Sequence, residues 1–455
     1  MTIEDLDREF LFHPFTNLRE HESTGPLTMV TGHGSTIVDT QGRTYLDAMA
    51  GLWCVNVGYG NVEIAETMRM QAEKLAFYHS FASMGNEPTA ELAQRLIATA
   101  PGSMSKVFFG NSGSDANDTQ VKLVWYYNNV LGRPEKKKII SRSRGYHGVT
   151  IMSASLCGLP GMHRAFDLPL PMVKHVRAPN RLWERAEGQT DEQFVAALAA
   201  ELEQLILDEG PETVAAFIAE PIQAAGGVIV PPEGYFAAIQ EVLRRYDVLF
   251  IADEVVCGFG RTGQNFGSEV FGIEPDLMTV AKGITSAYFP LSACIVSDKV
   301  WDVLSRGSQT YGVFQHGYTY SAHPLAAAVA LTNLDIIDRD GLVQQAKARG
   351  DHLAEKLQSA FAGHPLVAEV RGYGLLGAVE FAASTDPLTA IDPIGSFSGP
   401  VVKRMRELGV ISRALPNADS ISFSPPFVVT EDELDAMVAG ARQAVDDVAA
   451  DLHLL

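Results

Sequence analysis

Residues 248–255 read Val-Leu-Phe-Ile-Ala-Asp-Glu-Val, an apolar run that ends in two carboxylates. Because polar and apolar positions do not alternate in it, the run predicts a strand buried on both faces, as in a parallel sheet covered by helices. Residues 277–283, Leu-Met-Thr-Val-Ala-Lys-Gly, have the same form and end in a lysine. The two runs predict parallel neighbours whose polar tips face one pocket.

Similar apolar, β-branched runs recur through the middle of the chain, with helical stretches between them. The expected strands are Lys106–Phe109, Lys138–Ser141, Val173–Val176, Val214–Ala219, Val248–Ala252, Leu277–Val280 and Ala293–Val296. Helices between the strands supply the crossovers of an α/β fold. The pattern predicts a mostly parallel seven-stranded sheet, with a ligand site beyond the carboxyl ends of its strands.

The two ends of the chain have a different pattern. Residues 36–47 predict a β-hairpin, and residues 367–381 predict another strand pair. Residues 430–433, Thr-Glu-Asp-Glu, form a capping box that opens the last helix. We therefore expect an α/β protein with a large domain at residues 61–335 and a smaller α+β domain built from residues 1–60 and 336–455.

The charge and the cysteines exclude several classes of protein. The 455 residues carry a formal net charge of −20, which disfavours nucleic acid and anionic membranes as partners. The four cysteines form no CxxC pair, and the acidic N-terminus has no apolar core typical of a signal peptide. No histidine spacing is typical of a metal site. We expect a cytoplasmic protein without a metal ion or a membrane span.

Asp253 and Lys282 are a pair that a pyridine cofactor requires. An ionised aspartate keeps the ring nitrogen protonated, which makes the ring an electron sink, and a lysine condenses with the cofactor's aldehyde. Partial desolvation lowers the pKa of such a lysine, so that it serves as a nucleophile and then as a proton carrier. The structural alternative is that acids and lysines end strands in many proteins without any catalytic role.

A glycine-containing loop, residues 108–117, follows one expected strand and opens a helix. Gly113 and Ser114 could present backbone N–H groups and a hydroxyl to a phosphate at the helix N-terminus. The alternative is that Ser114 is simply the N-cap of that helix. Both interpretations can hold together.

Residues 258–263, Gly-Phe-Gly-Arg-Thr-Gly, match the GxGxxG pattern of dinucleotide-binding proteins. Asp276 lies roughly where a ribose-binding acid is expected. This pattern carries the alternative hypothesis of a nicotinamide-dependent dehydrogenase. We discount it because Asp253 and Glu254 end the strand before the glycines begin, and because no clear helix follows Gly263.

Several motifs in order resemble the class III aminotransferases of the fold-type-I pyridoxal-phosphate superfamily. They are Asp253-Glu254-Val255, Gly258-Phe259-Gly260-Arg261-Thr262-Gly263, Pro275-Asp276-Leu277, Ala281-Lys282-Gly283, Gly51-Leu52-Trp53, Tyr146-His147-Gly148, Glu220-Pro221-Ile222-Gln223 and His316-Gly317-Tyr318-Thr319-Tyr320. The resemblance spans nearly the whole chain. Within the class, these blocks are most similar to the ω-amine:pyruvate transaminases.

The resemblance implies pyridoxal phosphate as the cofactor and assigns roles around it. Lys282 would bind the cofactor as a Schiff base, and Asp253 would pair with the ring nitrogen. The residues implied to hold the ring, the phosphate and the surrounding groups are Val255, Tyr146, Gly113, Ser114, Glu220 and His147, with Thr319 of the partner subunit at the phosphate. Shared sites of this kind imply a homodimer.

The resemblance also implies a substrate pocket. It would be lined by Phe15, Trp53 and Ala225, with Phe81 of the partner subunit reaching in. Arg413 resembles a mobile arginine that binds the carboxylate of an oxo acid and moves aside for a plain amine. Departures from the family pattern are Ala287, where many relatives have glycine, and Asp115, where many have glutamate. Ala287 is expected to narrow the pocket.

Val149 indicates the substrate class. Relatives that act on γ-aminobutyrate or ornithine typically have an arginine at this position, after the His-Gly of residues 147–148. Without this cation we expect an amine or ω-amino acid donor, such as β-alanine, taurine, a diamine or an arylalkylamine, and pyruvate as acceptor. A decarboxylating or aminomutase enzyme of the same class remains the nearest alternative.

Overall fold

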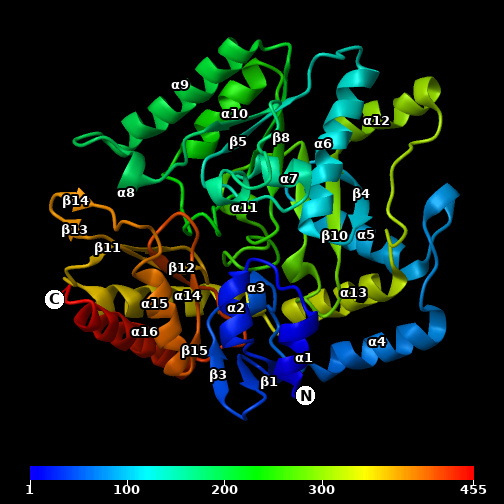
Figure 1. Cartoon of the computed structure of the whole chain (residues 1–455). Helices are drawn as coiled ribbons and strands as arrows, with labels where there is room; N and C mark the ends of the chain where they lie inside the picture. Colours follow the sequence, from blue (N-terminus) through cyan, green and yellow to red (C-terminus); the bar gives the residue numbers. More distant parts are fainter. Residues whose placement is uncertain (455) are drawn as a thin grey trace.

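The computed structural model describes residues 1–454, and its centre is the expected seven-stranded sheet (Figure 1). The strand order is β4 (Met104–Gly110), β10 (Ser292–Ser297), β9 (Leu277–Val280), β8 (Leu249–Asp253), β7 (Val214–Ala219), β5 (Lys138–Arg142) and β6 (Val173–Val176). Strand β10 pairs antiparallel with both β4 and β9, and the other neighbouring strands of this sheet pair parallel. The predicted α/β class and the mostly parallel sheet are confirmed.

Both faces of this sheet are buried, as its apolar strands require. Along β8, Leu249 and Ile251 face one hydrophobic cluster, while Phe250 and Ala252 face another. The first cluster contains α6 (Gly113–Val130) and α12 (Asp298–Tyr311). The second contains α5 (Glu87–Thr99), α9 (Asp191–Glu209), α10 (Tyr235–Arg245) and α13 (Pro324–Arg339). The helices therefore cover the sheet on both sides.

The two ends of the chain form the smaller part, in the lower left of Figure 1. One sheet contains β1 (Met29–His33), β2 (Thr36–Asp39), β3 (Thr44–Asp47) and β15 (Val410–Ile411). A second contains β11 (Val367–Gly372), β12 (Gly377–Phe381), β17 (Ser420–Phe423) and β16 (Arg413–Ala414). Because β3 pairs with β15, N-terminal and C-terminal residues share one sheet.

Helices α14 (Leu342–Phe361), α15 (Ser398–Glu407) and α16 (Glu431–Asp451) complete this part. Helix α16 begins at the predicted capping box, in which Thr430 and Glu433 bond to each other's backbone N–H groups. We propose the division into residues 1–60, 61–335 and 336–455 as domains. Helix α13 continues to Arg339, so the second of these boundaries lies within a helix.

The remaining elements are shorter or lie at the edges. They are α1 (Ile3–Phe10), α2 (Leu18–Thr24), α3 (Ala50–Trp53), α4 (Val62–Leu75), η1 (Phe81–Ser83), α7 (Ile151–Leu156), η2 (Pro160–Met162), α8 (Arg181–Glu184), α11 (Gly267–Phe271), η3 (Lys282–Ile284), β13 (Ser384–Thr385) and β14 (Leu388–Thr389). Within residues 1–454, no helix combines the length and the apolar character that crossing a membrane requires.

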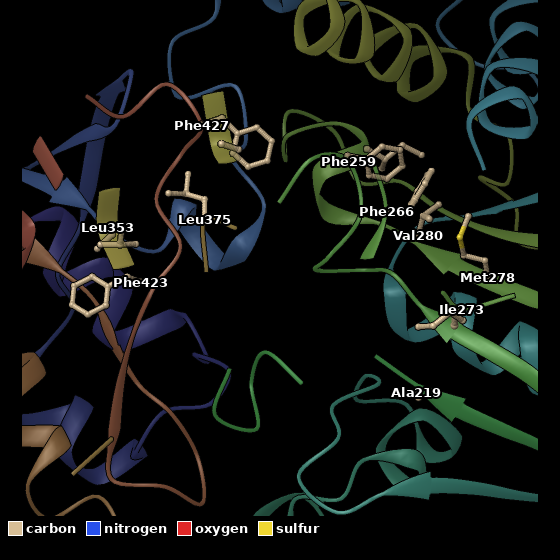
Figure 2. Close-up of a cluster of buried hydrophobic side chains, with 14 of the residues drawn as sticks. Ala219, Phe259, Phe266, Ile273, Met278, Val280, Leu353, Leu375, Phe423 and Phe427 are labelled. Atoms are coloured by element: carbon tan, nitrogen blue, oxygen red, sulfur yellow. The ribbon is translucent and has the colours of Figure 1, made fainter. Parts of the chain in front are cut away.

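The glycine-rich loop at residues 258–263 joins the two parts of the molecule. Figure 2 shows Phe259 and Phe266 beside the large sheet, and Leu375 and Phe427 on the opposite side of the shared core. The guanidinium of Arg261 lies 4.6 Å from the ring centre of Phe427. Its Nη1 donates to the carbonyl of Pro425 at 2.6 Å. The loop is a turn that ties the parts together. The short helix α11 begins at Gly267, so the expectation that no helix follows Gly263 holds only as far as Phe266.

Candidate active site

A cavity of about 330 Å³ lies beyond the carboxyl ends of β8 and β9, where the sequence predicted a ligand site. Its walls come from segments far apart in the chain. The expected cofactor residues that line it are Gly113, Ser114, Tyr146, His147, Glu220, Asp253, Val255 and Lys282. Ala287, the departure from the family pattern, also lines it.

Asp253 is a buried carboxylate held by three donors at the end of β8. Its Oδ2 lies 2.8 Å from His147 Nδ1 and 2.8 Å from the Asn117 amide nitrogen, and its Oδ1 accepts from the Val255 N–H at 3.1 Å. Burial raises the pKa of Asp253, but the hydrogen bonds from His147 and Asn117 outweigh it and leave that pKa below the ordinary value. The carboxylate is therefore ionised and fixed in place.

Lys282 follows β9 and faces the same cavity. Burial lowers its pKa, and the negative charge of Asp253 opposes this effect only in part. Its backbone is left-handed, with φ of 47°. A residue with a Cβ adopts this conformation at a cost that the surrounding structure must offset, and such residues concentrate at functional sites. The site thus presents an amine that loses its proton more readily than an ordinary lysine.

Gly113 and Ser114 form the opposite end of the cavity, in the first turn of α6. Ser112, rather than Ser114, is the N-cap, because its hydroxyl accepts from the Asp115 N–H at 3.1 Å. The structural alternative for Ser114 is therefore wrong. Its hydroxyl instead accepts from the Val149 N–H at 3.1 Å. The free backbone N–H groups at the start of this long helix are suited to bind an anion.

Two glycines, which have no side chain, keep this end of the cavity open. A Cβ on Gly148 would lie 2.6 Å from the hydroxyl oxygen of Ser114 and 2.5 Å from that of Ser153. A Cβ on Gly113 would lie 3.2 Å from a methyl group of Val255. The chain therefore passes close to the cavity at two glycines, where a larger residue would displace these neighbours.

Glu220 lies behind Tyr146 and fixes its backbone. Its carboxylate accepts from the N–H of Tyr146 at 3.0 Å and from the N–H of Ala224 at 3.1 Å. Burial raises the pKa of Glu220 to about 7, although His147 nearby opposes this rise. Burial also raises the pKa of Tyr146 to about 12, so its phenol stays neutral.

Trp53, Ala225 and Arg413 lie together near the cavity but are not among the residues that line it. Trp53 and Ala225 belong to one buried apolar cluster, against which Tyr146 packs. The guanidinium of Arg413 lies 5.2 Å from the ring centre of Trp53. Burial lowers the pKa of Arg413, and no carboxylate within residues 1–454 forms an ion pair with it. These three residues can therefore form the substrate side of the pocket.

Phe15, Phe81 and Thr319 are not brought to the cavity of their own chain. Phe15 is 69% exposed and Phe81 is 48% exposed. Thr319 is also exposed, in the segment before α13. Phe81 and Thr319 were expected to act in the site of a partner subunit, whereas Phe15 was expected in the pocket of its own chain. Their roles stay predictions.

Sequence reasoning missed Asn117, which lines the cavity, and the role of Arg261, which joins the two parts of the molecule. Asn117 supports Asp253 and also donates to the carbonyl of His147 at 2.7 Å. Its position four residues after Gly113, on the same helix face, is the signal that could have identified it. The sequence indicated Arg261 only as part of a glycine-rich pattern. No local signal indicates its contacts, because their partners are more than 100 residues away.

The arrangement fits a phosphorylated pyridine aldehyde. The cavity offers an ionised carboxylate for a ring nitrogen, an amine for an aldehyde and a helix N-terminus for a phosphate. Val255 and Tyr146 supply apolar and aromatic surfaces for a flat ring. The Nε2 of His147 and the Oδ1 of Asn117 are buried and have no hydrogen-bond partner among the described residues. Such orphaned polar atoms are common where a bound group or water completes the site.

The comparisons with known proteins agree with this geometry. The family model described as "Aminotransferase class-III" matches residues 18–445. The chain is 49% identical to the diaminobutyrate–2-oxoglutarate transaminase of Halomonas elongata, over 98% of this chain and 96% of that protein. It is 45% identical to the chloroplastic γ-aminobutyrate transaminase 3 of Solanum lycopersicum, over 95% of this chain and 83% of that protein.

A solved structure of the ω-transaminase from Pseudomonas jessenii, in complex with PMP, superposes with a TM-score of 0.97. That protein is 47% identical to this chain, and the match covers 100% of this chain and 99% of the other. The fold, the cavity and these similarities lead to one conclusion. The chain belongs to the class III aminotransferases, enzymes of the fold-type-I group that use pyridoxal phosphate.

Proposed function

We propose that this aminotransferase moves an amino group from an amine or ω-amino acid to pyruvate, giving an aldehyde or ketone and alanine. The observation that carries the proposal is the isolated Arg413, which lies against Trp53 without a carboxylate partner among the described residues. One guanidinium binds one carboxylate through two hydrogen bonds. Where an arginine would bind a second carboxylate, the chain has Val149, which is 55% exposed.

The chain's own groups have distinct roles in this chemistry. The bound cofactor supplies an aldehyde that condenses with amines and a ring that accepts electrons. Asp253, held by His147 and Asn117, would stabilise a proton on the ring nitrogen. Lys282 would bind the cofactor and, once free, carry a proton at its Nζ between the substrate carbon and the cofactor carbon. Its lowered pKa favours the neutral amine that accepts this proton.

The remaining residues position these groups. Gly113 and Ser114 would hold the phosphate at the start of α6, with its helix dipole favouring the negative charge. Val255 and Tyr146 would confine the ring between them. His147 fixes Asp253 directly, and Glu220 fixes the backbone of Tyr146. The contacts around the cavity support these proposed roles.

The stacking of Arg413 on Trp53 suits an enzyme that takes two kinds of substrate. A cation over an aromatic ring is stabilised by about 0.5–2 kcal/mol, which is small enough for a carboxylate to draw the guanidinium away. With pyruvate, Arg413 would bind the carboxylate. With a plain amine, Arg413 would stay against Trp53, and the apolar substituent would contact the apolar cluster that contains Trp53 and Ala225.

We also propose a homodimer with shared active sites. Large apolar side chains are exposed on the N-terminal segment and on the segment before α5, including Phe10, Phe12, Phe15, Phe81 and Met84. Large exposed apolar side chains on these two segments are typical of surfaces that another chain covers. Phe81 and Thr319 of the partner subunit would then complete each cavity.

The test supplies one donor at a time with either pyruvate or 2-oxoglutarate and measures alanine against glutamate. The donors are β-alanine, taurine, putrescine, α-methylbenzylamine and γ-aminobutyrate. The proposal expects alanine as the main product and an amine or ω-amino acid as the best donor. Preferential formation of glutamate would contradict the acceptor. Carbon dioxide release, or turnover without any acceptor, would favour the decarboxylating or aminomutase alternative.

A further inference from the structure

Three potential metal ligands converge in the N-terminal segment, outside the cavity. Asp7 lies in the last turn of α1, His13 follows that helix, and His21 lies in α2. One ligand atom from each lies within 4.8 Å of the other two. Figure 1 shows α1 and α2 side by side in the lower part of the molecule. The fold thus gathers a carboxylate and two imidazoles.

Hydrogen bonding within the cluster satisfies only one of the two imidazoles. His13 Nε2 lies 2.7 Å from Asp7 Oδ1, a normal hydrogen bond. His21 Nε2 lies 3.5 Å from the same oxygen, which is too long for a good one. That nitrogen is buried and has no hydrogen-bond partner within residues 1–454. An ion bound between the three atoms would satisfy the nitrogen that the protein leaves without a partner.

We propose that Asp7, His13 and His21 bind a divalent transition-metal ion, with Zn²⁺ as the fitting ion. Two imidazole nitrogens and one carboxylate oxygen are ligands that Zn²⁺ prefers, and a water molecule would take the fourth position. The side chains of Asp7, His13 and His21 are 16%, 27% and 11% exposed. The ligands are therefore shielded from solvent without being closed off from it.

The site fixes a segment that little else holds. Neither α1 nor α2 contains a buried residue. Phe15, the expected pocket residue, lies in the loop between His13 and His21. Metal binding would join both helices and this loop into one unit, because the ligands meet only when the segment is folded. The sequence predicted no metal because the spacing of positions 7, 13 and 21 matches no familiar ligand pattern.

The experiment uses the cofactor-loaded enzyme after dialysis against a chelator. Co²⁺ is titrated as the probe, because its visible d–d absorption reports four-coordinate binding, and Zn²⁺ is then added to displace it. The wild type should bind one equivalent per chain. Asp7→Asn and His21→Ala should each weaken binding at least about 10-fold. His33→Ala is the matched control, since this exposed histidine of β1 lies outside the cluster.

Limited trypsin digestion gives a second readout, because Arg8 and Arg19 lie within the segment. Zn²⁺ should slow cleavage at these arginines in the wild type and in His33→Ala but not in His21→Ala. The absence of saturable Co²⁺ binding, or equal binding by all four proteins, would overturn the proposal. Neither readout depends on transamination, so failure here is distinguishable from failure of the proposed function.

Discussion

The cavity has a floor, formed by Asp253, Lys282 and the groups bonded to Asp253, and an expected rim, formed by Phe15, Phe81 and Thr319. The chain supports the floor and the rim differently. On the floor, Asp253 is 3% exposed, and its bonded neighbours Asn117 of α6 and His147 are themselves buried. At the expected rim, Phe15 and Phe81 are largely exposed and reach no cavity in their own chain. The difference indicates that a single chain already positions the groups around Asp253, whereas Phe81 and Thr319 would complete a cavity only in the proposed homodimer.

Lys282→Ala tests the floor and has the largest expected effect. Loss of the amine removes both the nucleophile and the proton carrier, so the rate should fall at least about 10⁴-fold. The variant should still bind the cofactor, because the phosphate and ring contacts come from other residues. Single-turnover measurements with pyruvate would show the loss of rate. Lys299→Ala, which removes a surface lysine paired with Asp276, is the control. Normal turnover by Lys282→Ala would contradict the assignment.

Arg413→Ala tests the proposed substrate side of the pocket, which contains neither floor nor rim residues. Removal of a charged hydrogen-bond donor costs about 1.5–3 kcal/mol, so kcat/KM for pyruvate should fall about 10- to 100-fold. The half-reaction with α-methylbenzylamine should change little, because an amine does not use the guanidinium. Steady-state and half-reaction kinetics separate the two effects. An equal loss with amine and oxo acid would show that Arg413 has only a structural role.

Thr319→Ala tests the rim in the partner's site. If Thr319 of the partner subunit donates to the phosphate, its loss should weaken cofactor binding about 10-fold, the value of one hydrogen bond to a charged group. Equilibrium dialysis of the cofactor would measure this, with Thr310→Ala on α12 as the exposed control. An unchanged affinity would confine the cofactor contacts to one chain and sharpen the contrast between floor and rim.

Glu220→Gln should have the smallest effect, on stability against pH. Because burial raises the pKa of Glu220 from 4.5 to about 7, its folded form favours the protonated acid. The stability that this gives is complete below the ordinary pKa and is lost as pH rises through about 7. Between about pH 6 and 8 the free energy of unfolding should fall by about 1 kcal/mol more in the wild type than in the variant.

Denaturant unfolding at several pH values would measure this difference. His147 and Asp253 face Glu220 in both proteins, so the comparison isolates the titration of this carboxyl. Parallel pH profiles in the wild type and Glu220→Gln would show that Glu220 stays ionised in the folded protein.

The sequence predicted the floor because its signals are local. One apolar run ends in Asp253 and another ends in Lys282, and each run predicts a strand with a polar residue at its end. Both strands lie where expected. The contacts of Arg261 with Pro425 and Asn56 join residues far apart in the chain, and no local pattern encodes such distances. The convergence of Asp7, His13 and His21 likewise exists only in the folded segment.

The central claim is that Lys282, at the end of β9, binds the cofactor covalently. Borohydride reduction of the cofactor-loaded protein, followed by proteolysis and mass spectrometry of the peptides, identifies the lysine that carries the reduced phosphopyridoxyl group. We expect the group on Lys282, and we expect Lys282 to stay unmodified when the substrate amine is added in excess before reduction. Modification of another lysine, with Lys282 left free, would contradict it.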